Sequence, residues 1–96
     1  MNQDAANASM IKKARRALLD ALLLFEVAAD YRSIRNALPT IDNVHVRRDI
    51  KYLIDKGYVR RVNERPNQNE DDREYVLTAA GMERAQRIIV DPALEP

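Results

Sequence analysis

The sequence predicts one mainly α-helical domain with a small β-hairpin, in the order helix, helix, helix, strand, strand, helix. Apolar residues recur at helical spacing in four separate segments. At Gly57 the pattern changes from helical to extended, and β-branched and aromatic residues then flank a polar loop over residues 63–73. At 96 residues the chain can build one modest core, which indicates a single domain.

The composition argues against several classes of function. The chain has no cysteine and one histidine, so disulfides and the usual thiolate and imidazole metal sites are not expected. No apolar run approaches the roughly 20 residues that span a bilayer, and the first residues lack the pattern of a secretory signal. We therefore expect a cytoplasmic protein without membrane contact, and no cofactor is implied. The net charge of +1 gives no attraction of the whole molecule to nucleic acid.

The first helix is expected from about Met10 to Ala28, with Ser9 as its N-cap and residues 1–9 as a flexible tail. One apolar stripe at helical spacing should face the core: Ile11, Ala14, Leu18, Leu22 and Phe25. A second apolar side, formed by Leu19, Leu23 and Val27, exceeds what one core contact requires. This helix should therefore have a second partner, either another helix of the same chain or a second subunit.

Two further helices should follow the first. Asp30 is placed to cap a helix over residues 31–38, which Pro39 ends. Asp42 is placed to cap a third helix, which Gly57 should stop with a left-handed backbone conformation. The buried stripe predicted for the third helix consists of Val46, Ile50, Leu53 and Ile54.

A hairpin and a last helix complete the predicted domain. Residues 58–62 and 74–78 have the composition of strands, and the loop between them is polar and contains a proline. Thr78 is placed to cap a helix over about residues 79–90, which Asp91 and Pro92 end. The domain is thus expected to span residues 10–90, with residues 91–96 as a C-terminal tail.

Two local patterns resemble those of the winged helix-turn-helix superfamily. Residues 46–59, VRRDIKYLIDKGYV, resemble the recognition helix of bacterial winged-helix regulators and its exit into the wing. Residues 73–85, REYVLTAAGMERA, are similar to the closing wing strand and following helix of MarR- and PadR-like regulators. The size and the C-terminal stretch are also similar to those of small winged-helix proteins of Mu-like phages and prophages. The resemblance implies a sequence-specific double-stranded DNA-binding protein, a small dimeric transcriptional regulator of phage or prophage origin.

In such a module the third helix enters the major groove of DNA, and its first residues meet base edges. The reading surface implied here consists of Asn43, His45, Arg47, Arg48 and Lys51. The competing interpretation is that these are ordinary exposed helix charges, with Lys51 paired to Asp55 four residues later. His45 is expected to be a polar first-turn residue or a DNA contact and not a general base, because no orienting carboxylate or nucleophile is indicated near it.

The resemblance implies further phosphate contacts on the second helix and on the wing. The second helix crosses the DNA backbone in helix-turn-helix proteins. The residues implied there are Arg32, Ser33 and Arg35, and those implied on the wing are Arg60, Arg61 and Arg65. Three consecutive acids, Glu70, Asp71 and Asp72, depart from a basic wing. They argue against insertion of the wing tip into the minor groove, because DNA phosphates would repel them.

Homodimerisation is expected through the first and last helices. These helices carry more apolar surface than a monomer of this size requires, and palindromic operators match a two-fold dimer. The residues predicted for this contact are Leu19, Leu23, Val27, Met82, Ile88 and Ile89. The alternative is that the two helices pack on each other within one chain.

Two other functions stay open on the sequence alone. The first is a winged-helix protein–protein interaction module that does not bind DNA and whose acidic wing tip binds a basic partner. In that case the basic residues of the third helix would not form a continuous positive surface with Arg60 and Arg61. The second is an enzyme, and the scarcity of histidine, cysteine and glycine gives no reason to expect one. Nothing in the sequence indicates an effector ligand.

Overall fold

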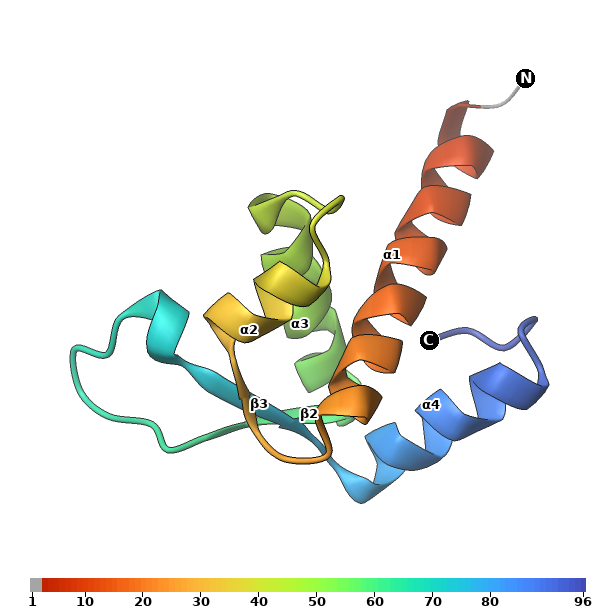
Figure 1. Ribbon diagram of the computed structural model, residues 1–96. Coiled ribbons are helices and arrows are strands. Elements are labelled where there is room, and N and C mark those ends of the chain that lie inside the picture. Colours follow the sequence, from red (N-terminus) through yellow and green to blue (C-terminus); the bar gives the residue numbers. More distant parts are fainter. Residues whose placement is uncertain (1–2) are drawn as a thin grey trace.

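The computed structural model describes the backbone of residues 3–96 and the side chains of residues 7–96. The elements are, in chain order, helix α1 (Gln3–Phe25), strand β1 (Ala29–Asp30), helix α2 (Tyr31–Ala37), helix α3 (Asn43–Asp55), strand β2 (Val59–Val62), the 3₁₀ helix η1 (Glu70–Asp72), strand β3 (Glu74–Leu77) and helix α4 (Ala79–Val90). Helices α2 and α3 lie on one side of α1 and α4 lies on the other, while the N-terminal end of α1 extends beyond the rest of the molecule (Figure 1). The predicted order of helices and hairpin strands is confirmed, with β1 and η1 as additions.

The three strands form an antiparallel sheet in the order β1-β3-β2. The predicted hairpin pairs Val59 with Leu77 and Val62 with Glu74. Strand β1, which the sequence analysis did not predict, pairs Ala29 with Tyr75 on the other edge of β3. It escaped prediction because two residues are too few to show a period of alternation.

The core lies where α1 meets α2, α3, α4 and the inner face of the sheet. The buried stripe predicted for α3 is confirmed at Val46, Ile50 and Leu53, while Ile54 is half-buried. The other fully buried large apolar side chains come from α1 and α2: Leu18, Leu19, Tyr31 and Ile34. Burial of such side chains removes apolar surface from water and is the main source of stability for a domain of this size.

The predicted caps are confirmed in part. The side chain of Asp30 accepts a hydrogen bond from the N–H of Ser33, and that of Thr78 accepts one from Gly81. Asp42 is the N-cap residue of α3, but its side chain makes no capping bond. The N-cap prediction for Ser9 is wrong, because α1 already begins at Gln3 and Ser9 lies inside it.

The boundaries of α1 differ from the prediction at both ends. The predicted tail, residues 1–9, is helical from Gln3 on, and its first two residues lie outside the described residues. The alanines of this segment favour the helix, which explains the longer element. At the other end Glu26 adopts a left-handed conformation with a φ of 61°, so α1 stops at Phe25 and leaves room for β1.

A tight junction joins the hairpin to α4. Gly57 has the predicted left-handed conformation, with a φ of 79°. The hydroxyl of Thr78 donates a hydrogen bond of 2.6 Å to the Gly57 carbonyl, and the Thr78 N–H donates one of 3.0 Å to the Tyr58 carbonyl. A Cβ atom on Gly81 would lie 1.9 Å from the Tyr58 carbonyl oxygen, so only glycine fits there.

The segment predicted as a C-terminal tail packs against the domain. The Tyr52 hydroxyl donates a hydrogen bond of 2.9 Å to the Pro96 carbonyl, and the Lys12 ammonium lies 3.3 Å from the Glu95 carboxylate. Leu94 packs on the core, and Arg16 bonds to the Pro92 carbonyl. The last residues therefore cover α1 and α3.

The dimer residues predicted from the sequence separate into three groups by burial. Leu19 and Ile88 are 0% and 2% exposed, so their part of the prediction is wrong: they pack within the chain's own core. Leu23 is half-buried. Val27, Met82 and Ile89 are exposed, at 71%, 42% and 64%, and of the six predicted residues these three offer the largest apolar area to a partner.

Candidate nucleic-acid interface

Helix α3 presents a polar outer face, because its apolar side is turned into the core. Asn43, His45, Arg47 and Lys51 are exposed, and all four belong to the reading surface implied by the resemblance. The Tyr31 hydroxyl of α2 lies 3.3 Å from the Asn43 carbonyl and 3.4 Å from its side-chain oxygen. This contact fixes the first turn of α3 against α2.

Arg47 makes a two-bond ion pair with Glu70 of η1. The Nε and Nη2 atoms of Arg47 donate hydrogen bonds of 2.8 Å each to the two carboxylate oxygens of Glu70. The pair lowers the pKa of Glu70, chiefly through the hydrogen bond from Arg47, and raises the pKa of Arg47 through the same bond. Glu70 is therefore ionised at neutral pH.

The two arginines of α2 meet the neighbouring acid of η1. Arg35 donates a hydrogen bond of 3.1 Å to Asp71, and the Nη2 atom of Arg32 lies 3.7 Å from the same carboxylate. Figure 1 shows η1 at the outer end of the hairpin, beside α2. Ser33 is half-buried, and its N–H binds Asp30. Three of the arginines predicted to contact DNA thus converge on two carboxylates of one 3₁₀ turn.

Arg48, unlike Arg47, binds a buried carboxylate. Its Nε and Nη2 atoms donate hydrogen bonds of 2.9 and 3.1 Å to Asp49, which is 1% exposed. Arg15 of α1 donates a third bond of 3.1 Å to Asp49, and its guanidinium lies 3.6 Å from the centre of the Tyr52 ring. The arrangement ties α3 to α1.

Sequence reasoning missed Asp49, although its position carried a signal. Asp49 lies three residues after Val46 and four before Leu53, so a helical period places it on the buried side. A carboxylate in that position needs cationic or hydrogen-bonding partners. Arg48, the preceding residue on the same helix, was a visible candidate, whereas Arg15 lies 34 residues away in the sequence and no spacing rule pointed to it.

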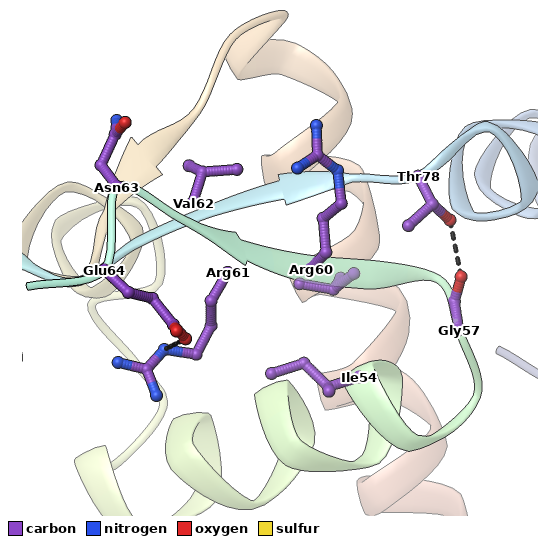
Figure 2. Close-up of a pocket in the computed structure, with 9 residues that line it drawn as sticks. Ile54, Gly57, Arg60, Arg61, Val62, Asn63, Glu64 and Thr78 are labelled. Carbon is purple, nitrogen blue, oxygen red and sulfur yellow. Dashed lines mark hydrogen bonds and ion pairs between the residues drawn. The ribbon is translucent and has the colours of Figure 1, made fainter.

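The wing arginines do not share one face. Arg60 and Arg61 point to opposite sides of β2, and Arg61 forms an ion pair of 3.0 Å with Glu64 (Figure 2). Both line an open groove of about 860 Å³ along β2, together with Ile54 of α3. Arg65 is exposed in the loop. Among the described residues, Arg60 and Arg65 are the predicted DNA-contacting cations without a carboxylate partner.

The predicted positive surface is therefore interrupted by acids. Lys51 also has a partner, since its ammonium lies 3.1 Å from Asp55, as the competing interpretation expected. The structure brings Arg32, Arg35 and Arg47 together around η1, but it does not bring Arg48 or Arg61 into that group.

The described part of the chain shows neither a candidate metal site nor a helix that could span a membrane. Among the side chains of residues 7–96 no group of three or more histidine, cysteine or acidic residues could hold a metal ion. Within residues 3–96 no helix combines the length and apolar character needed to cross a membrane.

Comparison with known proteins rests on two solved structures. No protein-family model matches the sequence, and no curated protein matches it. A mutant of ZitR from Lactococcus lactis in apo form superposes with a TM-score of 0.61 at 20% identity, over 90% of this chain and 61% of the ZitR chain. Diamide-treated YodB from B. subtilis gives a TM-score of 0.60 at 20% identity, over 100% of this chain and 98% of YodB.

The fold is a winged helix. In this fold α3 is the third helix of the helix-turn-helix, and the hairpin β2–β3 with its loop is the wing. This chain spans about three fifths of the length of the ZitR chain and nearly all of YodB. At 20% identity the likeness shows the fold alone.

Proposed function

We propose that this protein binds double-stranded DNA in a sequence-specific manner and acts as a small transcriptional regulator in the cytoplasm. The observation that supports this best is the exposed outer face of α3 on a winged helix, with Asn43, His45 and Arg47 in its first half. An α-helix fits the major groove of B-DNA, where side chains near its N-terminus reach base edges.

The proposed contacts follow from side-chain chemistry. Asn43 can make paired hydrogen bonds with adenine, and the guanidinium of Arg47 matches guanine or a phosphate. Lys51, Arg60 and Arg65 are exposed and suit phosphates. Arg48 is assigned a different role, because its two bonds to buried Asp49 keep it from reaching a base without breaking that pair.

We also propose a two-fold dimer, as palindromic operators require. The exposed apolar residues just after α1 and on α4, including Val27, Met82 and Ile89, support it. A phage or prophage origin is proposed on the sequence resemblance alone.

No cofactor or thiol-based response is proposed. The YodB structure is that of protein treated with diamide, a reagent that oxidises thiols. The present chain has no cysteine, so its own side chains cannot respond in that way.

One observation favours the alternative function, a protein–protein interaction module. The cations of α2 and α3 are largely neutralised within the chain by Glu70, Asp71, Asp49 and Asp55. Such a surface attracts DNA less than a continuous basic face would. A basic partner protein could instead bind the acids of the wing.

The two functions are separated by binding to random-sequence duplex DNA across a salt series. Wild-type protein is compared with Arg47→Gln/Lys51→Gln and with a control of equal charge loss, Lys13→Gln/Arg87→Gln, on α1 and α4. Each lost phosphate contact should flatten the slope of log K against log salt by about 0.9, so the first variant should lose up to about 1.8 and the control close to none. Absence of binding at low salt by the folded wild-type protein would favour the interaction module.

A further inference from the structure

The acids of η1 and the arginines of the proposed DNA-binding face form a contact that DNA itself would have to break. We propose that Glu70 and Asp71 act as an internal competitor for the DNA backbone, holding Arg47, Arg35 and Arg32 in the free protein and releasing them when a duplex binds. This inference rests on the proposed function. It assigns the acidic wing a role in limiting non-specific binding.

The geometry of the Arg47–Glu70 pair supports direct competition. A guanidinium binds a carboxylate and a phosphate through the same fork of parallel N–H donors. The Nε and Nη2 donors of Arg47 are both occupied by Glu70 at 2.8 Å. Arg47 cannot offer this fork to a phosphate or to guanine until Glu70 leaves.

The second carboxylate acts on the other helix of the motif. Asp71 contacts Arg35 at 3.1 Å and Arg32 at 3.7 Å, and both arginines belong to α2. In a helix-turn-helix protein α2 crosses the DNA backbone, while α3 enters the groove. One turn of η1 therefore neutralises cations on both elements that would approach the duplex.

Glu70 and Asp71 are also placed so that they can release their arginine partners. The side chains of Arg47 and Glu70 are 53% and 36% exposed, and exposed ion pairs contribute little to stability and are screened by salt. The loop that carries η1 has no ladder partner over residues 63–73, and Asn63 and Asn67 adopt left-handed conformations there. A duplex offers a dense row of phosphates, which can replace two carboxylates.

Competition of this kind predicts a specific change in DNA binding. Removal of the two acids should free three arginines without deleting any DNA contact, and affinity should rise. A variant that merely becomes more positive should gain much less, because its added charge lies far from the duplex. The two effects are separated by a control variant with the same change in net charge.

The test uses Glu70→Gln/Asp71→Asn beside Asp20→Asn/Glu26→Gln, whose acids lie at the end of α1 and have no ion-pair partner among the described residues. Binding of both variants and of wild type to random-sequence duplex DNA is measured from low to moderate salt. The η1 variant should bind about tenfold more tightly than wild type at low salt. In this variant DNA binding no longer has to break two or three exposed ion pairs, whose free energies together correspond to about that factor. The slope of log K against log salt should steepen by about 1 to 2 for this variant. In wild type the carboxylates freed from the arginines take up cations when DNA binds, and the variant lacks these carboxylates.

A second measurement tests the contact without DNA. The carboxyl group of Glu70 is titrated by NMR in wild type and in Arg47→Gln. The wild-type midpoint should lie lower, because the hydrogen bond from Arg47 favours the ionised form. Equal midpoints would show that the pair does not form in solution and would overturn the inference.

The DNA-binding outcomes separate the inference from the function on which it rests. If wild type binds and the η1 variant gains no more than the control, the competitor is disproved while the DNA-binding function stands. If neither wild type nor the η1 variant binds at low salt, the proposed function fails, and the competitor with it. A selective gain by the η1 variant supports both.

Discussion

Arg47 and Arg48 are neighbours on α3, and each donates two hydrogen bonds to one carboxylate. The bonds are similar in length, 2.8 Å for both bonds of Arg47 to Glu70 and 2.9 and 3.1 Å for those of Arg48 to Asp49. The two carboxylates differ in burial, since the Glu70 side chain is 36% exposed and that of Asp49 is 2% exposed. The hydrogen-bond lengths alone therefore do not tell which of the two pairs stabilises the fold.

Burial decides how much each ion pair contributes to stability, because water competes for the charges of an exposed pair and not for those of a buried one. An exposed carboxylate that loses its arginine is solvated at once, so the pair can exchange partners at small cost. A buried carboxylate that loses its arginine keeps an uncompensated charge in the core. Asp49 should accordingly matter for folding and Glu70 for binding. Asp49→Asn and Arg47→Gln test that ranking, and Asp30→Ala gives an effect of intermediate size for comparison.

The largest effect is expected from Asp49→Asn. Arg15 and Arg48 would lose the charge that they share, and the free energy of unfolding should fall by about 2 kcal/mol, less than the ~3–5 for a fully buried pair because both guanidinium groups reach solvent. Urea unfolding measures the loss. Asp55→Asn on the same helix, which breaks only the exposed pair with Lys51, is the control. Equal losses in the two variants would contradict the role of burial.

A smaller effect is expected from Asp30→Ala, which removes a capping bond between a carboxylate and a backbone N–H. The loss of this bond of 2.7 Å to Ser33 should cost about 1 kcal/mol at neutral pH. Hydrogen bonds from the side chain and from the backbone N–H of Ser33 keep the pKa of Asp30 below its usual 3.8. The stabilisation that they provide is therefore present above the unfolded pKa and lost as the pH falls through the folded one.

Urea unfolding of this variant at neutral pH and in strong acid checks both statements. The difference from wild type should shrink in acid, where Asp30 is protonated in both states. Asp42→Ala provides the control, because Asp42 is also an N-cap residue but makes no side-chain capping bond. A pH-independent loss in Asp30→Ala would show that the carboxylate charge is not involved.

The smallest effect on stability is expected from Arg47→Gln. The partner it leaves, Glu70, can be solvated, so the urea midpoint should stay within the error of the measurement. Arg48→Gln, one residue further along, should lower that midpoint clearly. A loss of the same size in both variants would mean that η1 is part of the folded framework, and exchange with DNA would then be costly.

The fold was accessible from the sequence because its determinants are local. The helical period of Val46, Ile50 and Leu53 and the left-handed Gly57 are properties of short segments. The same holds for the caps at Asp30 and Thr78. The prediction failed at two places: the helix propensity of the alanines at the start of α1 was not taken into account, and a two-residue strand showed no pattern.

The candidate interface was less accessible, because its pairings join distant parts of the chain. Arg47 and Glu70 are 23 residues apart, and Arg15 and Asp49 are 34 apart. The acids of residues 70–72 were noticed as unusual for a wing, but no spacing rule says that they fold back on α2 and α3. The burial of Leu19 and Ile88 is likewise a property of the assembled domain, and it removes them from the predicted dimer contact.

The junction between the hairpin and α4 decides where this chain can tolerate inserted residues. At the inner end, the Thr78 bonds to Gly57 and Tyr58 and the close fit of Gly81 fix the spacing, so an inserted residue would break all of them. At the outer end of the hairpin, residues 63–67 are exposed to solvent, and doubling the length of that loop adds only about 0.6 kcal/mol of closure entropy. A peptide label or a longer wing should therefore be inserted at the outer end.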